Sequence, residues 1–425
     1  MPPERREVLV LGAGVVGMAT AYSLARRGHA VTIVDKAPEP GRGTSFANGG
    51  QLSYVYSDAL GSPALLRKLP RLLAAADPAF RLIPSFDPDF LRWSVAFLRN
   101  CTSERFFENT LAGLRLALES RAAMHALLQR HPIEFGHAAP GKLHLYEDAA
   151  SRDGAARLVA AKRDAGAHQS MLTPDEAVRV EPALASVVKR LSWVLHSPQE
   201  EVGDPYLFCK GMLAALQRDF GVTARFGTTV RRLLLDGPKP VMELDGGGRL
   251  EPDGVALCTG IDTPALLRGA GIRVPIWPMK GYSFTANPGA EAPQVSITDV
   301  TRKLVFCRLS GRIRVAGLAD LGNRDRSIDE RRLGSLIAAT RESLPAAVDY
   351  DRIESEWAGL RPMTPNSLPI IRLERPGLVL NVGHGALGWT YAMGAAERAA
   401  RMLVGDDALS PAERDRAIGS RAAAG

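Results

Sequence analysis

A chain of 425 residues can bury a large core and exceeds the usual size of one domain, so we expect two domains, consecutive or interleaved. Its hydrophobic content of 46% and charged content of 23% are typical of a globular enzyme. The basic residues behind the formal net charge of +7 are scattered, which argues against a nucleic-acid-binding surface, while a weakly positive field favours anionic substrates and membrane surfaces.

The N-terminal segment predicts a strand–helix–strand unit. An apolar strand over residues 8–11 is followed by a helix over 15–27, which Gly28 ends as a C-cap glycine. A second apolar strand, rich in β-branched residues, follows over 30–35. This order is that of the βαβ unit of nucleotide-binding folds.

The remaining elements follow from composition and hydrophobic spacing. Residues 42–62 are rich in Gly, Ser and Asn and predict a long loop, while 64–83 is leucine-rich, basic and broken by prolines. The other predictions are helix 104–130, strand 142–146, a helix after the capping box at 173–176, a helix from Pro205 to just before Gly221, strands 222–226, 229–235 and 255–258, antiparallel strands 281–287 and 303–318, strand 377–382 and helix 390–403.

Residues 12–17 read Gly-Ala-Gly-Val-Val-Gly, a GxGxxG motif between the first strand and the helix. Gly12 permits the tight turn, Gly14 lets a pyrophosphate approach the backbone, and Gly17 lets helix and strand pack closely. The positive end of the helix dipole then faces the phosphates. Val15 and Val16, which open the helix, belong to the same predicted site.

Asp35 ends the second strand, beside Lys36, where a carboxylate can hold ribose hydroxyls. Strand, glycines, helix, second strand and acid occur in register, so the pattern predicts a dinucleotide site. The alternative is a tight strand–helix turn that binds nothing, in which Asp35 is a surface acid.

The loop after this unit favours FAD over NAD. It is long, small and polar, so it can wrap a pyrophosphate and reach a flavin ring, whereas an NAD dehydrogenase more often continues directly into its next βα unit. The alternative is an ordinary surface loop. The loop residues predicted to bind the cofactor are Thr44, Ser45, Asn48, Gly49, Gln51 and Leu52.

A second glycine-rich segment, residues 381–390, precedes the last predicted helix. A helix N-terminus at this point stabilises the negative charge that a flavin gains on reduction. His384 either takes part in this or is a structural loop histidine, and the sequence leaves both readings open. The predicted cofactor residues here are Gly383, His384, Gly385, Leu387, Gly388, Trp389 and Thr390.

Arg361 lies between a glycine and a proline in the apolar stretch 357–365. A guanidinium is expensive to bury without an anion, and its planar fork fits a carboxylate with two parallel hydrogen bonds. Arg361 therefore predicts a carboxylate-binding position, with a surface salt bridge as the alternative.

These motifs together resemble the D-amino-acid oxidase superfamily of FAD proteins, and within it the bacterial D-amino acid dehydrogenases of the DadA type. The resemblance runs over nearly the whole chain. Its specific marks are GAGVVG at 12–17, TSFANGGQLS at 44–53, PMKGYS at 278–283, GLRPMTP at 359–365 and GHGALGWT at 383–390.

The resemblance implies roles for individual residues. Arg361 grips the substrate carboxylate, and the 44–52 and 383–390 loops hold the flavin. Val230 meets the adenine, and Gly260, next to Thr259, lines the FAD. Lys280 and Tyr282 lie near the substrate cavity.

The chain departs from the family pattern at Ser53-Tyr54-Val55-Tyr56, at Asn366-Ser367 and over 298–308. The first difference falls near the expected pocket, so it bears on substrate choice and leaves the flavin fold untouched.

The predicted fold is α/β: a Rossmann-type FAD-binding domain, like that of glutathione reductase, interleaved with an α+β substrate domain on a mixed or antiparallel sheet. Segments 1–85, 197–262 and 345–418 are expected to form the FAD-binding domain. Segments 86–196 and 263–344 form the substrate-binding domain in this division, and 419–425 is a tail.

The predicted reaction is hydride transfer from Cα–H of a D-amino acid to flavin N5, followed by hydrolysis of the imine to a 2-oxo acid and ammonia, with a quinone or another non-oxygen acceptor. Catalytic candidates are Arg361, Lys280, His384, Tyr56 and Tyr282, although either tyrosine could instead be a core or rim aromatic. The rivals are a dehydrogenase for a cyclic D-imino acid such as proline or hydroxyproline, a glycine or sarcosine oxidase that uses oxygen, and a non-catalytic FAD-binding subunit.

The four cysteines stand far apart in apolar contexts, so we expect buried free thiols and no metal site. We expect no signal peptide and no membrane-spanning segment, hence a cytoplasmic enzyme. The basic segment 64–83 has two readings: a core piece beside the active site, which its prolines favour, or a peripheral contact with the inner face of the cytoplasmic membrane that gives access to quinone. The oligomeric state is left open.

Overall fold

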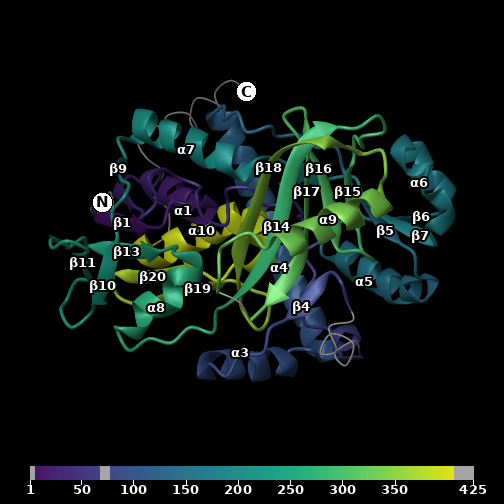
Figure 1. Cartoon of the computed structure of the whole chain (residues 1–425). Helices are drawn as coiled ribbons and strands as arrows, with labels where there is room; N and C mark the ends of the chain where they lie inside the picture. The colour runs from purple at the N-terminus through teal and green to yellow at the C-terminus, as the bar shows by residue number, and fades with distance from the viewer. Residues whose placement is uncertain (1–4, 68–76, 323, 406–425) are drawn as a thin grey trace.

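The computed structural model describes residues 5–67, 77–322 and 324–405. Figure 1 shows two halves side by side, each built on its own sheet. One half holds a six-stranded sheet in the order β19-β20-β13-β1-β2-β9, parallel except for the edge strand β19. Its strands are β1 (Glu7–Leu11), β2 (Ala30–Val34), β9 (Thr223–Arg225), β13 (Gly254–Leu257), β19 (Ile370–Arg375) and β20 (Leu378–Val382).

Helices cover this sheet, and its central strands β13 and β20 are buried over their whole length. The helix α1 (Val15–Ala25) packs against α10 (Gly388–Val404), which also contacts α4 (Ser103–Arg130). Helix α7 (Pro205–Phe220) joins this layer; Asp204 accepts hydrogen bonds from its first N–H groups, and Gly221 ends it in the left-handed conformation.

The other half is a nine-stranded mixed sheet in the order β18-β14-β17-β16-β15-β5-β7-β6, with β4 pairing to β17. The pairs β15–β5 and β17–β4 are parallel, and the others are antiparallel. The strands are β4 (Phe80–Leu82), β5 (Lys142–Tyr146), β6 (Ser170–Leu172), β7 (Trp193–Ser197), β14 (Trp277–Pro288), β15 (Ser296–Asp299), β16 (Leu304–Leu309), β17 (Arg312–Leu321) and β18 (Val348–Met363).

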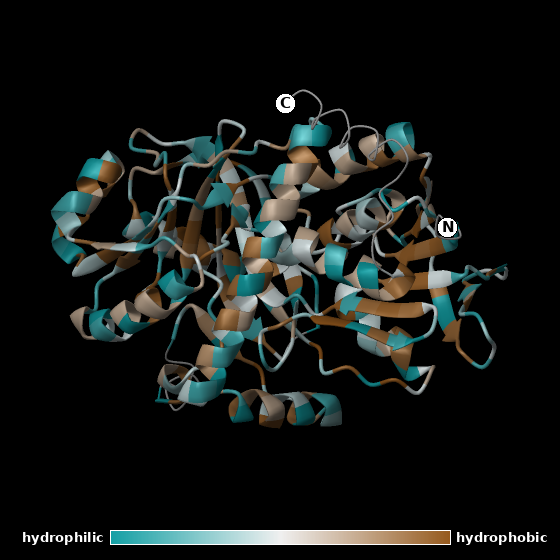
Figure 2. Cartoon of the chain, turned by 180° about the vertical axis from the view of Figure 1, so that it is seen from behind, coloured by the Kyte–Doolittle hydropathy of each residue, from teal (hydrophilic) through white to brown (hydrophobic). Residues whose placement is uncertain are grey.

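Shorter elements surround these sheets. Figure 2 shows apolar colour on the strands near the N-terminus and hydrophilic colour on the outer turns of helices. The helices are α3 (Pro88–Arg99), α5 (Arg152–Asp164), α6 (Pro174–Val180), α8 (Thr263–Arg268) and α9 (Glu330–Ser343), and the small sheets comprise β10 (Val230–Leu234), β11 (Val241–Leu244) and β12 (Arg249–Leu250), and β3 (Gln51–Leu52) with β8 (Glu201–Val202).

The predicted α/β class, with a Rossmann-type half and a mixed-sheet half, is confirmed. The strand at 142–146 and the capping box of Thr173 and Glu176 are also confirmed. The single strand predicted over 303–318 is wrong, because it is a hairpin: Ser310 and Gly311 both have positive φ, the geometry of a tight two-residue turn between β16 and β17.

The sheets also bear on the division into domains. Strand β18 begins at Val348 and pairs along β14 in the mixed sheet, although the division by sequence gives 345–418 to the FAD-binding half. By sheet membership, the C-terminal return to the six-stranded sheet begins with β19 at Ile370. The tail at 419–425 and residues 68–76 of the basic segment lie outside the described residues.

Candidate active site

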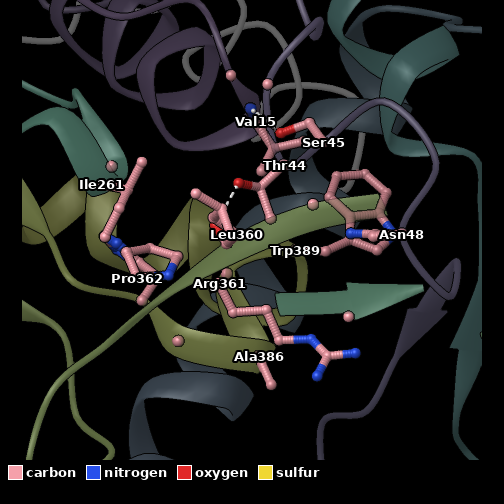
Figure 3. Close-up of a pocket in the computed structure, with 18 of the residues that line it drawn as sticks. Val15, Thr44, Ser45, Asn48, Ile261, Leu360, Arg361, Pro362, Ala386 and Trp389 are labelled. Carbon is pink, nitrogen blue, oxygen red and sulfur yellow. Dashed lines mark hydrogen bonds between the residues drawn. The ribbon is translucent and has the colours of Figure 1, made fainter. Parts of the chain in front are cut away.

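A cavity of about 1200 Å³ lies where the carboxyl ends of β1 and β2 meet the mixed sheet. Its lining combines the GxGxxG turn, the 43–51 loop, the 384–389 segment and inward residues of β14–β18. Figure 3 shows part of it, with Val15, Ser45 and Thr44 on one side and Arg361 and Ala386 on the other. The ligand-binding crevice of an open α/β sheet lies at this edge of the strands.

The backbone packs so closely at positions 12 and 17 that only glycine fits there. A Cβ on Gly12, which has φ +106°, would stand 2.5 Å from the carbonyl oxygen of Cys258. A Cβ on Gly17 would stand 1.7 Å from the carbonyl oxygen of Gly12. Gly14 occupies the N-cap position of α1 and offers no side chain to cap it, so the helix N-terminus faces the cavity.

Asp35 fixes this turn. Its carboxylate accepts hydrogen bonds from the N–H groups of Ala13 at 2.6 Å and Ala37 at 2.7 Å, and it lines the cavity. Lys36 also lines the cavity and pairs with Asp262 at 2.6 Å on the surface. The carboxylate therefore holds the end of β2 against the glycine turn while facing the space that a ribose would take.

The loop at 43–52 is pinned to both halves of the molecule. The Ser45 hydroxyl accepts the N–H of Val15 at 3.2 Å, and the Thr44 hydroxyl donates to the carbonyl of Leu360 on β18 at 2.8 Å, the dashed line in Figure 3. The side chain of Asn48 accepts the N–H of Gly50 at 2.9 Å. The loop thus forms a fixed wall of the cavity rather than a free surface segment.

Most of the predicted cofactor residues line this cavity. Leu52 does not, since its side chain packs in the core between the helices of the Rossmann half. Gly17 acts through the packing described above, and Thr390 accepts the N–H of Ser53 at 2.9 Å. The lining includes Gly12, Gly14, Val15, Val16, Asp35, Lys36, Thr44, Ser45, Asn48, Gly49, Gln51, Val230, Thr259, Gly260, His384, Gly385, Leu387, Gly388 and Trp389.

His384 stands just before α10, buried, and it lines the cavity. Burial lowers the pKa of its imidazole to about 3, so the ring is neutral at physiological pH. Its Nε2 atom is buried without a hydrogen-bond partner among the described residues. Gly383 has φ +72°, and a Cβ there would stand 2.6 Å from the Thr364 side chain, so this turn requires glycine to present the imidazole.

Arg361 extends from β18 into the cavity, away from Thr44 in Figure 3. Its Nη1 donates to the carbonyl of Leu318 on β17 at 3.1 Å. Burial lowers the pKa of the guanidinium to about 10, and the more distant Asp320 opposes this. Within the described ranges 5–67, 77–322 and 324–405, no carboxylate forms an ion pair with Arg361. Asp320 therefore offsets only part of the cost of burying this guanidinium, and no ion pair within the described ranges offsets the rest.

Tyr282 lines the cavity, but its hydroxyl donates to buried Asp320 at 3.2 Å. Asp320 also pairs with Arg81 at 2.6 Å and with Arg332 at 2.7 Å. Burial, together with Asp320, raises the pKa of Tyr282. Tyr282 is therefore a neutral phenol, and its hydrogen bond to Asp320 fixes it in the cavity wall.

Lys280 stands outside the cavity lining. Alternation along β14 explains this, because Met279 and Gly281 on either side line the cavity and Lys280 faces the other way, with its ammonium 5.4 Å from the centroid of the Tyr282 ring. The ammonium of Lys280 is buried and contacts Asp325 at 3.2 Å. The resemblance implied that Lys280 lies near the substrate cavity, whereas in the structure it lies behind the cavity wall.

Tyr56 lines the far end of the cavity and stacks on His144, with ring centroids 3.7 Å apart. Burial raises the pKa of its hydroxyl well above the usual value. Sequence reasoning missed two further lining residues here, Lys142 and Thr298. A lysine at an inward position of the apolar strand β5 was the available signal for the first.

The residues of this cavity fit FAD. One end offers a helix N-terminus with glycine at its N-cap and a carboxylate at the tip of β2, as a dinucleotide requires. The other end offers the unpartnered Nε2 of His384 beside the start of α10, which carries no side-chain cap. The described residues contain no group of three or more His, Cys, Asp or Glu side chains arranged for a metal, and their four cysteines are buried and unpaired.

Comparisons with known proteins agree with this geometry. Residues 7–402 match the family of FAD dependent oxidoreductases named DAO. The chain is 39% identical to D-amino acid dehydrogenase 2 of Ralstonia nicotianae over 401 residues, which is 92% of this chain and 94% of that protein. It is 38% identical to the D-amino acid dehydrogenase of Paramagnetospirillum magneticum over 403 residues, 94% and 95% of the two chains.

Solved structures show the same fold. Glycine oxidase from Geobacillus kaustophilus superposes with a TM-score of 0.74 at 22% identity, covering 95% of this chain and 96% of that one. L-α-glycerophosphate oxidase from Mycoplasma pneumoniae, solved with FAD bound, gives 0.74 at 19% identity, covering 96% and 97%. The chain therefore belongs to the DAO family of FAD-dependent oxidoreductases.

Proposed function

We propose that this enzyme is a FAD-dependent D-amino acid dehydrogenase that oxidises D-amino acids to 2-oxo acids and ammonia. The observation that carries the proposal is Arg361, a desolvated cation with no ion-paired carboxylate among the described residues, in the cavity that also holds the dinucleotide turn. A substrate carboxylate supplies the missing anion. The curated relatives named D-amino acid dehydrogenases support the substrate class and its configuration.

Arg361 does the binding. Its fork accepts a carboxylate with two hydrogen bonds, and its anchor on the carbonyl of Leu318 holds the fork in place. The substrate is thus held at one end, which orients its Cα–H within the cavity. When bound, FAD supplies the acceptor for the hydride of Cα–H.

None of the candidates Tyr56, Tyr282 and His384 among the described lining residues is a strong base for this step. Tyr56 and Tyr282 are neutral phenols with raised pKa, and His384 is neutral but buried. The substrate must therefore enter with its amine unprotonated, so that the lone pair on nitrogen assists loss of hydride from Cα. The imine that results is hydrolysed to the 2-oxo acid and ammonia.

The test is anaerobic addition of D- and L-amino acids to the FAD-loaded enzyme. We expect the flavin absorbance near its visible maximum to bleach with D-amino acids and to persist with their L-enantiomers. A non-catalytic FAD-binding subunit would bleach with neither. Preferential bleaching with D-proline or D-hydroxyproline would instead identify a cyclic imino acid dehydrogenase.

We further propose a quinone or another non-oxygen acceptor. Turnover in air should then yield little hydrogen peroxide, while addition of a soluble quinone or dye accelerates it. Stoichiometric peroxide would identify an oxidase of the glycine or sarcosine type.

An apolar surface on α3 supports access to a membrane-borne quinone. The inner side of α3 buries Phe90 and Trp93, yet its outer side is apolar as well. Exposed Arg92 pairs with Asp89 at 2.8 Å, so the positive charge that suits anionic lipid is the net charge of +7 of the whole chain. No helix in the described part of the chain is both long and apolar enough to cross a bilayer. The outward apolar residues are Phe86, 93% exposed, with Leu91, Val95 and Leu98, 50%, 49% and 41% exposed.

We propose that this surface contacts the anionic inner face of the cytoplasmic membrane. Sedimentation with vesicles containing anionic lipid should capture the wild-type protein and release the Phe86→Ser, Leu91→Ser double variant. If the wild-type protein stays in the supernatant at low salt, the membrane contact is refuted. The proposed oxidation of D-amino acids is not affected by that result.

A further inference from the structure

One continuous row of side chains crosses the mixed sheet above the cavity. Directly paired residues of neighbouring strands share a face, and the register pairs Trp357 with Ser283, Ser283 with Ala316, Ala316 with Val305 and Val305 with Thr298. All five line the cavity. The same register continues from Thr298 to His144 on β5, so the cavity roof runs from the Arg361 strand to the far strands of the sheet.

The far end of this roof is polar. Lys142 follows the same face of β5 as His144, is 3% exposed, and lines the cavity. Its ammonium donates to the hydroxyl of Ser53 at 2.7 Å. On the neighbouring strand β15, opposite His144, the buried hydroxyl of Thr298 has no hydrogen-bond partner among the described residues. The Arg361 end and this end therefore belong to one cavity, but the proposed chemistry uses only the first.

The carboxylates of Glu200 and Asp58, which lie near Lys142, bind other groups. The Glu200 carboxylate accepts the N–H groups of Tyr54 at 2.5 Å, Val55 at 3.1 Å and Tyr56 at 3.0 Å. The Asp58 carboxylate pairs with the ammonium of Lys162, which is fully buried.

An ammonium carries three N–H donors, and Ser53 takes one of those of Lys142. Burial lowers the pKa of Lys142 to about 8, which Glu200 opposes, so the charge is held at neutral pH at a desolvation cost. A buried donor and a buried hydroxyl on one wall are costly to leave unsatisfied.

The geometry points to a subsite for the side chain of the substrate: we infer that Lys142 and Thr298 bind a terminal carboxylate or carboxamide oxygen of a D-amino acid. This inference rests on the proposed function and names its preferred substrate class. Neighbouring strands lie about 4.8 Å apart, so the β17 strand that anchors Arg361 and the β15 strand of Thr298 are separated by roughly 10 Å. Hydrogen bonds of about 2.9 Å at each end leave room for a side chain of glutamate or glutamine length.

The experiment compares D-glutamate and D-glutamine with D-norleucine, which has similar length and no oxygen. In the wild-type enzyme we expect both oxygen-bearing substrates to show the higher kcat/KM. Lys142→Met should lower the ratio of kcat/KM for D-glutamate over D-norleucine by about 10- to 100-fold, mostly through KM. A smaller loss for D-glutamine than for D-glutamate would assign the effect to charge, and equal losses would assign it to the hydrogen bond.

A second variant guards against misfolding of the first. Thr298→Val keeps the shape of the side chain and removes only the unpartnered hydroxyl, so it should fold and still reduce the preference for the oxygen-bearing substrates. The control is Thr340→Val on α9, which is buried and outside the cavity lining; its substrate ratios should match those of the wild type.

Unchanged ratios in both Lys142→Met and Thr298→Val, with D-amino acids still oxidised, would overturn the subsite alone. Absence of turnover with every D-amino acid in the wild-type enzyme would instead overturn the proposed function.

Discussion

The guanidinium of Arg361 lies directly over Gly281 on the neighbouring strand, where a Cβ would stand 2.2 Å from Nη2 and 2.4 Å from Cζ. The absence of a side chain at Gly281 is thus what gives the guanidinium its path from β18 to the carbonyl of Leu318. The proposed carboxylate site therefore depends on three strands, β18, β14 and β17, and on a residue that has no side chain of its own to contribute.

Gly281→Ala tests this dependence. The added methyl group displaces the guanidinium, and a shift near 1 Å in a positioning group can cost about 10²-fold in rate. We expect kcat/KM for D-amino acids to fall by about that factor while FAD content stays at the wild-type level. The matched control is Gly334→Ala on α9, whose new Cβ meets nothing within 4 Å; wild-type kinetics in Gly281→Ala would refute the contact.

Gly17→Ala tests the dinucleotide turn. Its Cβ would stand 1.7 Å from the carbonyl oxygen of Gly12, so α1 must move away from β1 and carry the phosphate-binding N-terminus with it. We expect the Kd for FAD to rise at least ~100-fold, which is about 2.8 kcal/mol. Fluorescence titration of the apoprotein measures it. Gly154→Ala on α5, where nothing lies within 4 Å, is the control and should bind FAD like the wild type.

Much of the dinucleotide site could be predicted from the sequence because its signals are local. Strand, glycine turn, helix and Asp35 follow one another within one βαβ unit, and the structure places them together as expected. Lys142 and Thr298 stand far apart in the chain, and only the order of strands in the mixed sheet brings them to one wall, where Lys142 meets Ser53.

The edge strand β18 escaped prediction for a related reason. Its first part is polar and exposed, as befits an edge, so it lacks the alternation that predicts a strand with a buried face. Lys280 shows a further limit: alternation places it on the opposite face of β14 from Met279 and Gly281, but only the packing of the strand in the sheet shows which face borders the cavity.

Glu201 predicts a pH dependence of stability. Burial alone would raise the pKa of its carboxyl, but hydrogen bonds from His137 at 2.9 Å and His125 at 2.5 Å outweigh it, and the net pKa lies below the ordinary value of 4.5. A carboxyl whose pKa is lower in the folded state stabilises the fold above its unfolded pKa, and this contribution is lost as pH falls through the folded value.

The comparison is Glu201→Gln against the wild type. Its thermal midpoint should lie below the wild-type value at pH 7, by an amount equivalent to about 1–3 kcal/mol, and the gap should narrow as pH falls from 5 toward 3. A gap that stays constant over this range would show that the carboxylate charge contributes nothing.

The central claim is that Arg361 holds the substrate carboxylate in the cavity that binds FAD. Its most direct test is anaerobic flavin reduction by a D-amino acid in Arg361→Lys, with the substrate concentration varied. Loss of the planar fork should raise the half-saturating concentration by about 100-fold, while the FAD content and the flavin spectrum match the wild type. Half-saturation at the wild-type concentration would contradict the account.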